Sequence, residues 1–570
     1  MLRIPTRELP LWIKEHVDEC MASASERGQV YGRASQYYYT GTQDSRAAIY
    51  NKCKPFIEKL SGFLMQPTDV RFQIGFDSGE SDDVLDRAQL VGEKLTTDFR
   101  NTDCDVKFSE AVTWSLINGC QLLKLRPDGP SFNMAPVHPQ NFGVLNETTV
   151  SLEEQEAFCH VSYPTISRLR AWLREIDHPK RADILARIVT ESTGDERDAE
   201  PMTYWHQMVV GGLNPAGNIN EQPSAAGIVN VFPTPMPYRP NKKFAPTVKF
   251  CELWVKDLER DGDYTTVQCV YGAEPIIIEG SDTRRNLSRV PGHSSFVKVQ
   301  GQPTPGYFWG RSIIADVQML QEVLNKRLRD IKVMWDRNVG APQVLSGFTS
   351  VTEEAYFKIL NEGGFLSDPN PNAKATKLTE PPPENYMEEL QFLMGLFDEA
   401  SGFTPVMSGQ GESGVRAGTH AQTLVRTSSP RLIDQASRIE RTLADCGYLG
   451  LSIMQAMDAS IYTTDKGKEF LLSQLPENFN VSVDSHSASP AFAEDNRQVA
   501  IALARAGAID AEDLIHLTHP PGSEMLLARL RQRKKEQAQA AQQEEQQDLL
   551  RDVLRLPQRK QGGGGGRKPK

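Results

Sequence analysis

The sequence lacks any long hydrophobic run. Its longest candidate, Cys446 to Met457, covers twelve residues and is interrupted by Gly447 and Gly450. A helix that crosses a membrane needs about 18–20 apolar residues in succession, so we expect no contact with a membrane. Charged side chains also break up the opening stretch MLRIPTRELPLWIKEHVDEC, and this pattern predicts no signal peptide.

The cysteines show none of the spacings that bind metal or form a disulfide framework. They are widely separated, and no CxxC pair occurs, so the sequence predicts no zinc site and favours buried free thiols. At roughly 150 residues per domain, 570 residues correspond to about four domain-equivalents, enough to bury a core without covalent staples. The eight cysteines are Cys20, Cys53, Cys104, Cys120, Cys159, Cys251, Cys269 and Cys446.

An excess of positive charge is also missing. The chain carries 63 basic and 74 acidic residues, a formal net charge of −11. Proteins that hold nucleic acid statically usually show a basic surface, so this class is disfavoured. A protein that lets DNA slide past remains compatible, because acidic walls repel phosphate and offer no tight binding site.

Motifs for nucleotide binding or catalysis are absent as well. There is no Walker A, HExxH or GxSxG pattern, and the ten histidines are scattered singly. The string GQGESG matches GxGxxG literally, with Asp434 twenty residues beyond Gly414, but a helix and Pro405 precede it where a dinucleotide site needs a strand. We therefore predict no catalytic, cofactor or metal site, and we interpret the glycine-rich string as a loop.

The pattern of elements predicts an α+β fold that is predominantly helical. Residues 1 to about 120 contain helix-like periods, with an alternating strand at Val70 to Phe76 and a change from helix to strand at Gly119. Residues 125–300 hold short β-rich pieces, including a hairpin signal at Asp261-Gly262. Helices are expected again around Pro164 to Ile176 and Pro179 to Thr190.

Residues 311–340 form the most regular predicted helix. Its apolar positions recur at steps of three and four residues, which predicts one continuous stripe. Gly340 and Pro342 mark its end. The stripe consists of Ile313, Val317, Leu320, Leu324, Leu328, Ile331 and Trp335.

A small insert and a returning helix follow. Residues 341–384 are predicted as a compact α/β insert, with a helix at Val351 to Leu360 and a strand in KATKLTE. The next helix, 385–403, carries four acids and no Lys or Arg. That acidity indicates either an ordinary solvated face or a surface that faces DNA or a partner, and both interpretations remain open.

The last third of the chain is helical with one glycine-rich interruption. Residues 404–430 begin polar and rich in glycine, and Pro430 starts a long amphipathic helix with heptad-like spacing. A short strand is expected at Asn480 to Asp484, and residues 491–570 are helical before a flexible basic tail.

The order of these elements resembles that of the portal, or head–tail connector, family of tailed bacteriophages. Local strings support the resemblance over roughly residues 45–520. Each string is weak evidence alone, and the order of the strings gives the resemblance its support. They are KPFIEKLSGFLMQP (Lys54 to Pro67), EAVTWSLINGCQLLKL (Glu110 to Leu125), HPQNFGV (His138 to Val144), DEASGFTPVMSGQG (Asp398 to Gly411) and SPRLIDQASRIERTLADCGYLGLSIMQ (Ser429 to Gln455). Val406 stands where the family has a second proline, and the insert is short.

The resemblance implies a ring, usually of twelve subunits, around a central channel at one capsid vertex. It assigns 1–310 to a wing, 311–340 and 385–403 to stem helices, 341–384 to a clip, 404–430 to a tunnel loop, 431–490 to the return of the wing and 491–570 to a crown. The chain would be a non-enzymatic virion component, assembled in the host cytoplasm. Its expected partners are other copies, double-stranded DNA in transit, the terminase large subunit, a tail adaptor, and the major capsid and scaffolding proteins.

Particular residues follow from this assignment. The expected DNA-facing residues of the tunnel loop are Gly409, Gln410, Glu412, Arg416, His420 and Arg426. Candidates for lining the channel are Lys326, Arg329, Lys332, Glu388 and Glu389. Candidates for binding a partner at the clip are Lys358, Glu362, Asp368, Lys374, Lys377 and Glu380. The stripe from Ile313 to Trp335 is expected to pack between subunits.

Two alternatives remain. One is a different virion or scaffold protein with a helical bundle and no channel. The other is a metal-dependent nuclease whose carboxylates are not clustered in the sequence. A central hole by microscopy and metal-dependent cleavage of DNA distinguish them.

Overall fold

The computed structural model describes the chain in two compact units, Met1–Ala491 and Phe492–Lys570. The described residues are 9–42, 50–65, 70–76, 82–175, 180–191, 248–257, 263–272, 275–278, 294–339, 343–362, 368–377, 385–402, 430–457, 459–462, 469–472, 479–483, 500–509 and seven single positions between 511 and 533. In the second unit, residues 500–505 are helical. The rest of this section concerns the first unit.

Helices and strands alternate irregularly, as expected for an α+β chain. The α-helices are α1 (Leu9–Cys20), α2 (Ala24–Thr40), α3 (Cys53–Leu64), α4 (Asp82–Asn101), α5 (Cys104–Asn118), α6 (Ile166–Glu175), α7 (Arg181–Glu191), α9 (Ile314–Val339), α10 (Glu353–Glu362), α11 (Tyr386–Ser401) and α13 (Pro430–Ala456). A short 3₁₀ helix, η3 (Pro139–Asn141), precedes β4. No described helix is both long and apolar enough to span a bilayer.

The strands of the described residues form five small sheets with antiparallel pairing. The largest has the order β4-β5-β6-β7-β8, and a three-stranded sheet has the order β3-β2-β9. The remaining pairs are β1-β14, β10-β11 and β12-β13. The strands are β1 (Phe72–Phe76), β2 (Gln121–Asp128), β3 (Ser131–Val137), β4 (Phe142–Val144), β5 (Ala157–Ser162), β6 (Phe250–Asp257), β7 (Asp263–Val270), β8 (Ile276–Ile277), β9 (Phe296–Val299), β10 (Gln343–Ser346), β11 (Lys374–Lys377), β12 (Ser460–Tyr462), β13 (Glu469–Leu471) and β14 (Phe479–Val483).

The predicted change from helix to strand at Gly119 is confirmed. Helix α5 ends at Asn118, and Gly119 adopts φ 95°, in the region that favours glycine. A Cβ atom there would lie 2.8 Å from the backbone nitrogen of Arg311. Only glycine therefore lets β2 begin beside the segment that leads into α9.

Helix α13 ties the end of the first unit to its beginning. Its predicted amphipathic pattern is confirmed, since Ile439, Leu443 and Cys446 are buried. Strand β14, which follows α13, pairs with β1 in the register Phe72↔Val483. Residues about 400 positions apart therefore share one sheet.

All eight cysteines are buried and free, as predicted. Four of them, Cys20, Cys159, Cys251 and Cys269, share one hydrophobic cluster beneath α1. Burial raises the pKa of the Cys120 thiol to about 12. A protonated, inaccessible thiol is a poor nucleophile and a poor metal ligand, so these side chains serve as small core residues.

Buried ionisable groups lie where the sheets meet. Lys124 on β2 forms an ion pair with Glu252 on β6, and Trp254 Nε1 donates to Glu252 Oε1 at 3.1 Å. Burial opposes the charged form of Glu252, yet the positive charge of Lys124, a weaker attraction from His160 and these hydrogen bonds lower its pKa. Burial lowers the pKa of His160, and that of His138, to about 3.

These two histidines predict a loss of stability in mild acid. Both have a folded-state pKa below the ordinary value of 6.5, so their contribution is complete above about pH 6.5 and is lost as the pH falls toward 3. Each additional proton that the unfolded chain binds adds about 1.4 kcal/mol per pH unit to the slope of unfolding free energy against pH. We expect His160→Gln to reduce the slope of unfolding free energy between pH 6 and 4, measured by urea titration. His16→Gln, on the half-exposed side of α1, is the control and should keep the slope of the unmodified chain.

Candidate functional site in the stem hairpin and its tip

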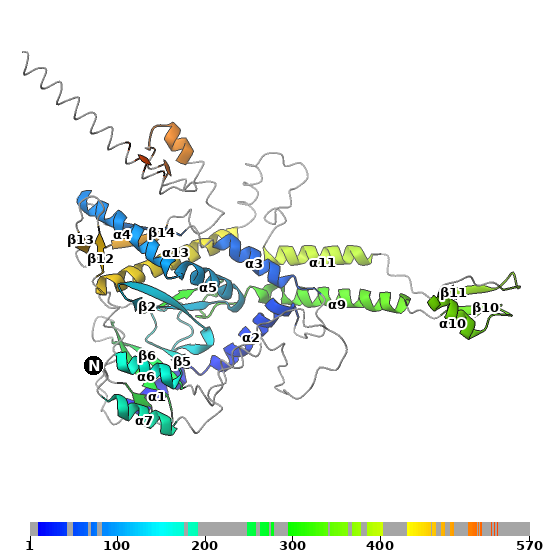
Figure 1. Cartoon of the computed structure of the whole chain (residues 1–570), viewed down its shortest axis with the longest axis horizontal. Helices are drawn as coiled ribbons and strands as arrows, with labels where there is room; N and C mark the ends of the chain where they lie inside the picture. The colour runs from blue at the N-terminus through cyan, green and yellow to red at the C-terminus, as the bar shows by residue number, and fades with distance from the viewer. Residues whose placement is uncertain are drawn as a thin grey trace, which may run out of the picture. The chain divides into compact units, whose positions relative to one another are not determined.

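Helices α9 and α11 form an antiparallel pair, which we call the stem hairpin (Figure 1). At 1.5 Å per residue, α9 is about 39 Å long and α11 about 24 Å. Arg327 Nε lies 2.8 Å from Glu389 Oε1, and the Tyr386 hydroxyl donates to the Arg327 carbonyl at 3.1 Å. The start of α11 therefore contacts the middle of α9. The two predicted helices, 311–340 and 385–403, are confirmed with ends a few residues shorter.

Two buried side-chain amides hold the first half of α9 to the connection between α2 and α3. Gln321 donates to the Tyr50 carbonyl at 2.7 Å and accepts from the Lys52 backbone nitrogen at 3.0 Å. Asn325 donates to the Gly41 carbonyl at 2.9 Å and accepts from the Tyr50 backbone nitrogen at 3.0 Å. Both side chains are completely buried. Each amide thus satisfies backbone groups that no helix or strand satisfies.

A carboxylate completes this set of contacts at the base of α9, which we call the amide anchor. Glu322, between the two amides, accepts hydrogen bonds from the hydroxyls of Tyr37 and Thr42, each at 3.0 Å. Contacts from two neighbouring turns of α9 therefore join it to the end of α2 and to the residues that follow α2. The anchor sets the direction in which α9 leaves the core.

Lys52 makes several contacts with the end of helix α11. Lys52 Nζ lies 2.7 Å from Asp398 and donates to the Met394 carbonyl at 3.0 Å. The same ammonium group lies 5.0 Å from the centre of the Phe397 ring, which is buried against Phe56. Charge, hydrogen bond and ring packing together hold the end of α11 to the start of α3.

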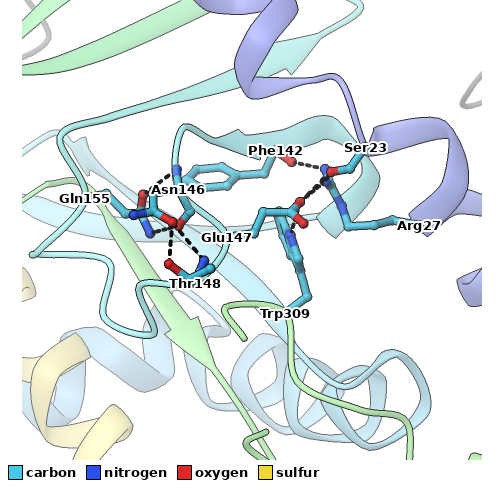
Figure 2. Close-up of polar contacts among 8 residues, drawn as sticks. All are labelled: Ser23, Arg27, Phe142, Asn146, Glu147, Thr148, Gln155 and Trp309. Carbon is cyan, nitrogen blue, oxygen red and sulfur yellow. Dashed lines mark hydrogen bonds and ion pairs between the residues drawn. The ribbon is translucent and has the colours of Figure 1, made fainter. Parts of the chain in front are cut away.

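A polar cluster fixes the segment that leads into α9. Figure 2 shows the Glu147 carboxylate accepting hydrogen bonds from Arg27, Ser23 and Trp309, at 2.8 Å for Arg27 and 2.7 Å for Trp309 Nε1. The Arg27 guanidinium also stacks 3.9 Å from the Trp309 ring centre and donates to the Phe142 carbonyl. Because Trp309 lies five residues before α9, this cluster joins α2, β4 and the base of the hairpin.

Burial decreases along α9. Ile313, Val317 and Leu324 are buried inside the subunit, whereas Trp335 is 64% exposed and Val339 is 82% exposed. The first three leave no surface for a neighbouring chain, so their expected packing between subunits is replaced by packing within one. Leu320, Leu328 and Ile331 are intermediate. The apolar stripe thus continues past the point where the core of the chain ends.

Exposed apolar side chains concentrate in this region. Ten of the eighteen large hydrophobic residues exposed in the described part of the chain lie between Ile314 and Gly402. On α11 they include Met387 and Phe392, each 65% exposed, which were not among the predicted site residues. The sequence does indicate them, because a helix with apolar residues on all sides is expected to be covered on all sides.

The predicted charged residues of the hairpin differ in their surroundings. Lys326, Arg329 and Lys332 are exposed on α9, and Glu388 is exposed on α11. Glu389 instead pairs with Arg327 inside the hairpin, so it has a structural contact. A channel-lining role for the other four stays a prediction.

The predicted insert is a small α/β element, which we call the tip. Strands β10 and β11 pair antiparallel, with α10 between them in the chain. The Asp368 carboxylate accepts from the backbone nitrogens of Asn370, Ser350 and Thr349 at 2.9 to 3.0 Å and also from both hydroxyls. These bonds hold the pKa of Asp368 well below its usual range. Asp368 was predicted to bind a partner, but its carboxylate organises the loops of the tip itself.

The other predicted tip residues have mixed positions. Lys377 Nζ donates to the Val339 carbonyl at 3.3 Å, which satisfies a terminal carbonyl of α9. Lys358 and Lys374 are exposed, together with Phe357 at 54%. Glu362 ends α10, and Glu380 lies outside the described residues. Phe357 and Lys358 are therefore adjacent exposed residues on α10.

The predicted tunnel loop lies outside the described residues. This applies to Gly409, Gln410, Glu412, Arg416, His420 and Arg426. Among the residues that the structure describes, no three His, Cys, Asp or Glu side chains gather where they would hold a metal ion.

No family profile matches the chain, and no curated protein matches it. Function is therefore argued from the sequence and the geometry.

The amide anchor predicts a specific cost for Gln321→Leu. The substitution keeps the apolar volume but leaves the Lys52 nitrogen and the Tyr50 carbonyl without their partner. A buried unsatisfied group costs about 1–3 kcal/mol, so unfolding free energy from urea titration should fall by at least that amount. Faster hydrogen exchange at the Lys52 amide would locate the effect. Gln391→Leu, on the exposed side of α11, is the control, and an equal loss there would contradict the anchor.

Proposed function

We propose that this chain is the subunit of a portal ring, through which double-stranded DNA enters and leaves a phage capsid. The ring would sit at one capsid vertex and present its tip first to the packaging terminase and later to a tail adaptor. It would act as a conduit and docking ring, while a separate motor hydrolyses ATP.

One observation gives the proposal most of its support: the apolar stripe of α9 extends beyond the part of the helix that the core of the chain covers. A stripe that ends at an exposed Trp335 is unfavourable for an isolated chain, because apolar surface in water is costly. Neighbouring copies in a ring would bury it. The exposed Met387 and Phe392 on α11 support the same conclusion.

The electrostatics are compatible with a conduit. Twelve copies would carry a formal charge of about 12 × −11 = −132. A strongly acidic ring repels DNA and leaves no tight site along the path, while a few basic side chains at the narrowest point can slow its movement. The glycine-rich segment with Arg416 and His420 is the proposed position of those contacts.

The central test is the mass and shape of the purified chain. At 63.6 kDa per chain, twelve copies would give about 763 kDa by light scattering, and negative-stain images should show a ring with a central hole. A closed particle without a hole would favour the scaffold alternative. Metal-dependent cleavage of plasmid DNA by the purified chain would favour the nuclease.

A second experiment tests the proposed DNA contacts. We expect Arg416→Ala with His420→Ala to leave ring assembly intact and to reduce packaging or retention of DNA, because both substitutions remove side chains that can contact phosphate. Packaging efficiency and DNA leakage from filled heads are the measurements. Unchanged packaging and retention would remove the support for the tunnel-loop assignment.

A further inference from the structure

The stem hairpin has two outer edges of unlike chemistry. On α9, Lys326, Arg329 and Lys332 are exposed and recur at steps of three residues. This spacing places them on the side of α9 opposite Arg327, the residue that contacts α11. We call this surface the basic edge.

The outer side of α11 is acidic and apolar. Between Asn385 and Gly402 there is no Lys or Arg. Two of the four acids have partners within the subunit, because Glu389 pairs with Arg327 and Asp398 pairs with Lys52. Exposed on α11 are Met387, Glu388, Met394 and Glu399, and we call this surface the acidic edge.

The acidic edge also includes a position without a side chain, Gly395. A Cβ atom added to Gly395 would meet nothing within 4 Å among the described atoms. Helices approach closely where one of them carries a small residue. Met394 directly precedes this position and Met387 lies about two turns before it, and methionine side chains adapt readily to a partner surface.

Glu388 of the acidic edge lies at the height of the basic edge. The contact between Arg327 and Glu389 shows which turns of the antiparallel helices are level with each other. Counting back one residue on α11 and forward one on α9 puts Glu388 level with Leu328, between Lys326 and Arg329. Copies related only by rotation about an axis along the hairpin keep this level, so Glu388 of one copy lies level with Lys326 and Arg329 of the next.

We propose that the copies associate head to tail, with the basic edge of one stem hairpin against the acidic edge of the next. This inference rests on the proposed ring and names the contact that closes it. Unlike edges make a heterologous interface, which forms a closed ring when the rotation closes.

The same charges disfavour a simple dimer at this surface. Pairing by a twofold axis would bring basic edge to basic edge, or acidic edge to acidic edge, and like charges across an interface are costly. The apolar contacts supply most of the association, from Met387, Met394 and the aliphatic parts of Lys326 and Lys332. The charges select the direction in which the copies meet.

Charge reversal on each edge tests the contact with the full-length chain. Lys326→Glu should raise the concentration for half-assembly by about tenfold or more, measured by light scattering at low and high salt. Glu388→Lys should do the same. The two substitutions together should restore assembly, because the two positions are again complementary. The matched control is Arg168→Glu, an equal change in charge on the exposed side of α6.

Each outcome separates the two proposals. If the unmodified chain forms no ring at any concentration, the proposed function fails and this contact fails with it. If it forms a ring that both reversed variants also form at the same concentration, the ring stands and the contact is wrong. Loss of assembly in each reversed variant, with recovery in the combined one, supports the contact and rules out misfolding as the cause.

Discussion

The geometry of the stem hairpin depends on two side-chain amides that replace missing backbone partners. Gln321 and Asn325 satisfy the peptide groups of the connection between α2 and α3, where no regular structure does so. Because the outer half of α9 has little core of its own, its direction is set at this anchor. The carboxylate of Glu147 adds a second fixed point just before α9 begins, through Trp309.

The base of the stem hairpin and its outer part differ in which side chains are buried and which are exposed. Inside the subunit, polar groups are paired at the base, and Asp368 organises the tip in the same way. Farther along the hairpin, apolar and charged side chains are exposed together. The internal bonds fix the shape, and in the proposed ring the exposed surface would contact other copies. The buried neutral histidines and protonated thiols of the body are core side chains.

Much of the local structure follows from sequence periodicity. Helices α9, α11 and α13, the strands β1, β6, β7 and β14, and the turn at Gly119 agree with the predicted pattern within a few residues. Strands β3, β5, β9, β10, β12 and β13 were not predicted, since short strands without a clear alternation resemble loops. The buried cysteines were also predictable, because thiols without metal or disulfide spacing behave as small apolar residues.

The sequence by itself determined the elements and their order, because the periods of 3.6 and 2 residues depend on neighbours along the chain. The tertiary structure alone decided which half of the α9 stripe is covered, since burial of Val317 and exposure of Trp335 depend on distant segments. It also decided that Gln321 faces backbone groups near residue 50, that Asp368 bonds within the tip, and that β1 pairs with β14. These contacts join residues from about 20 to about 400 positions apart, and no local pattern records them.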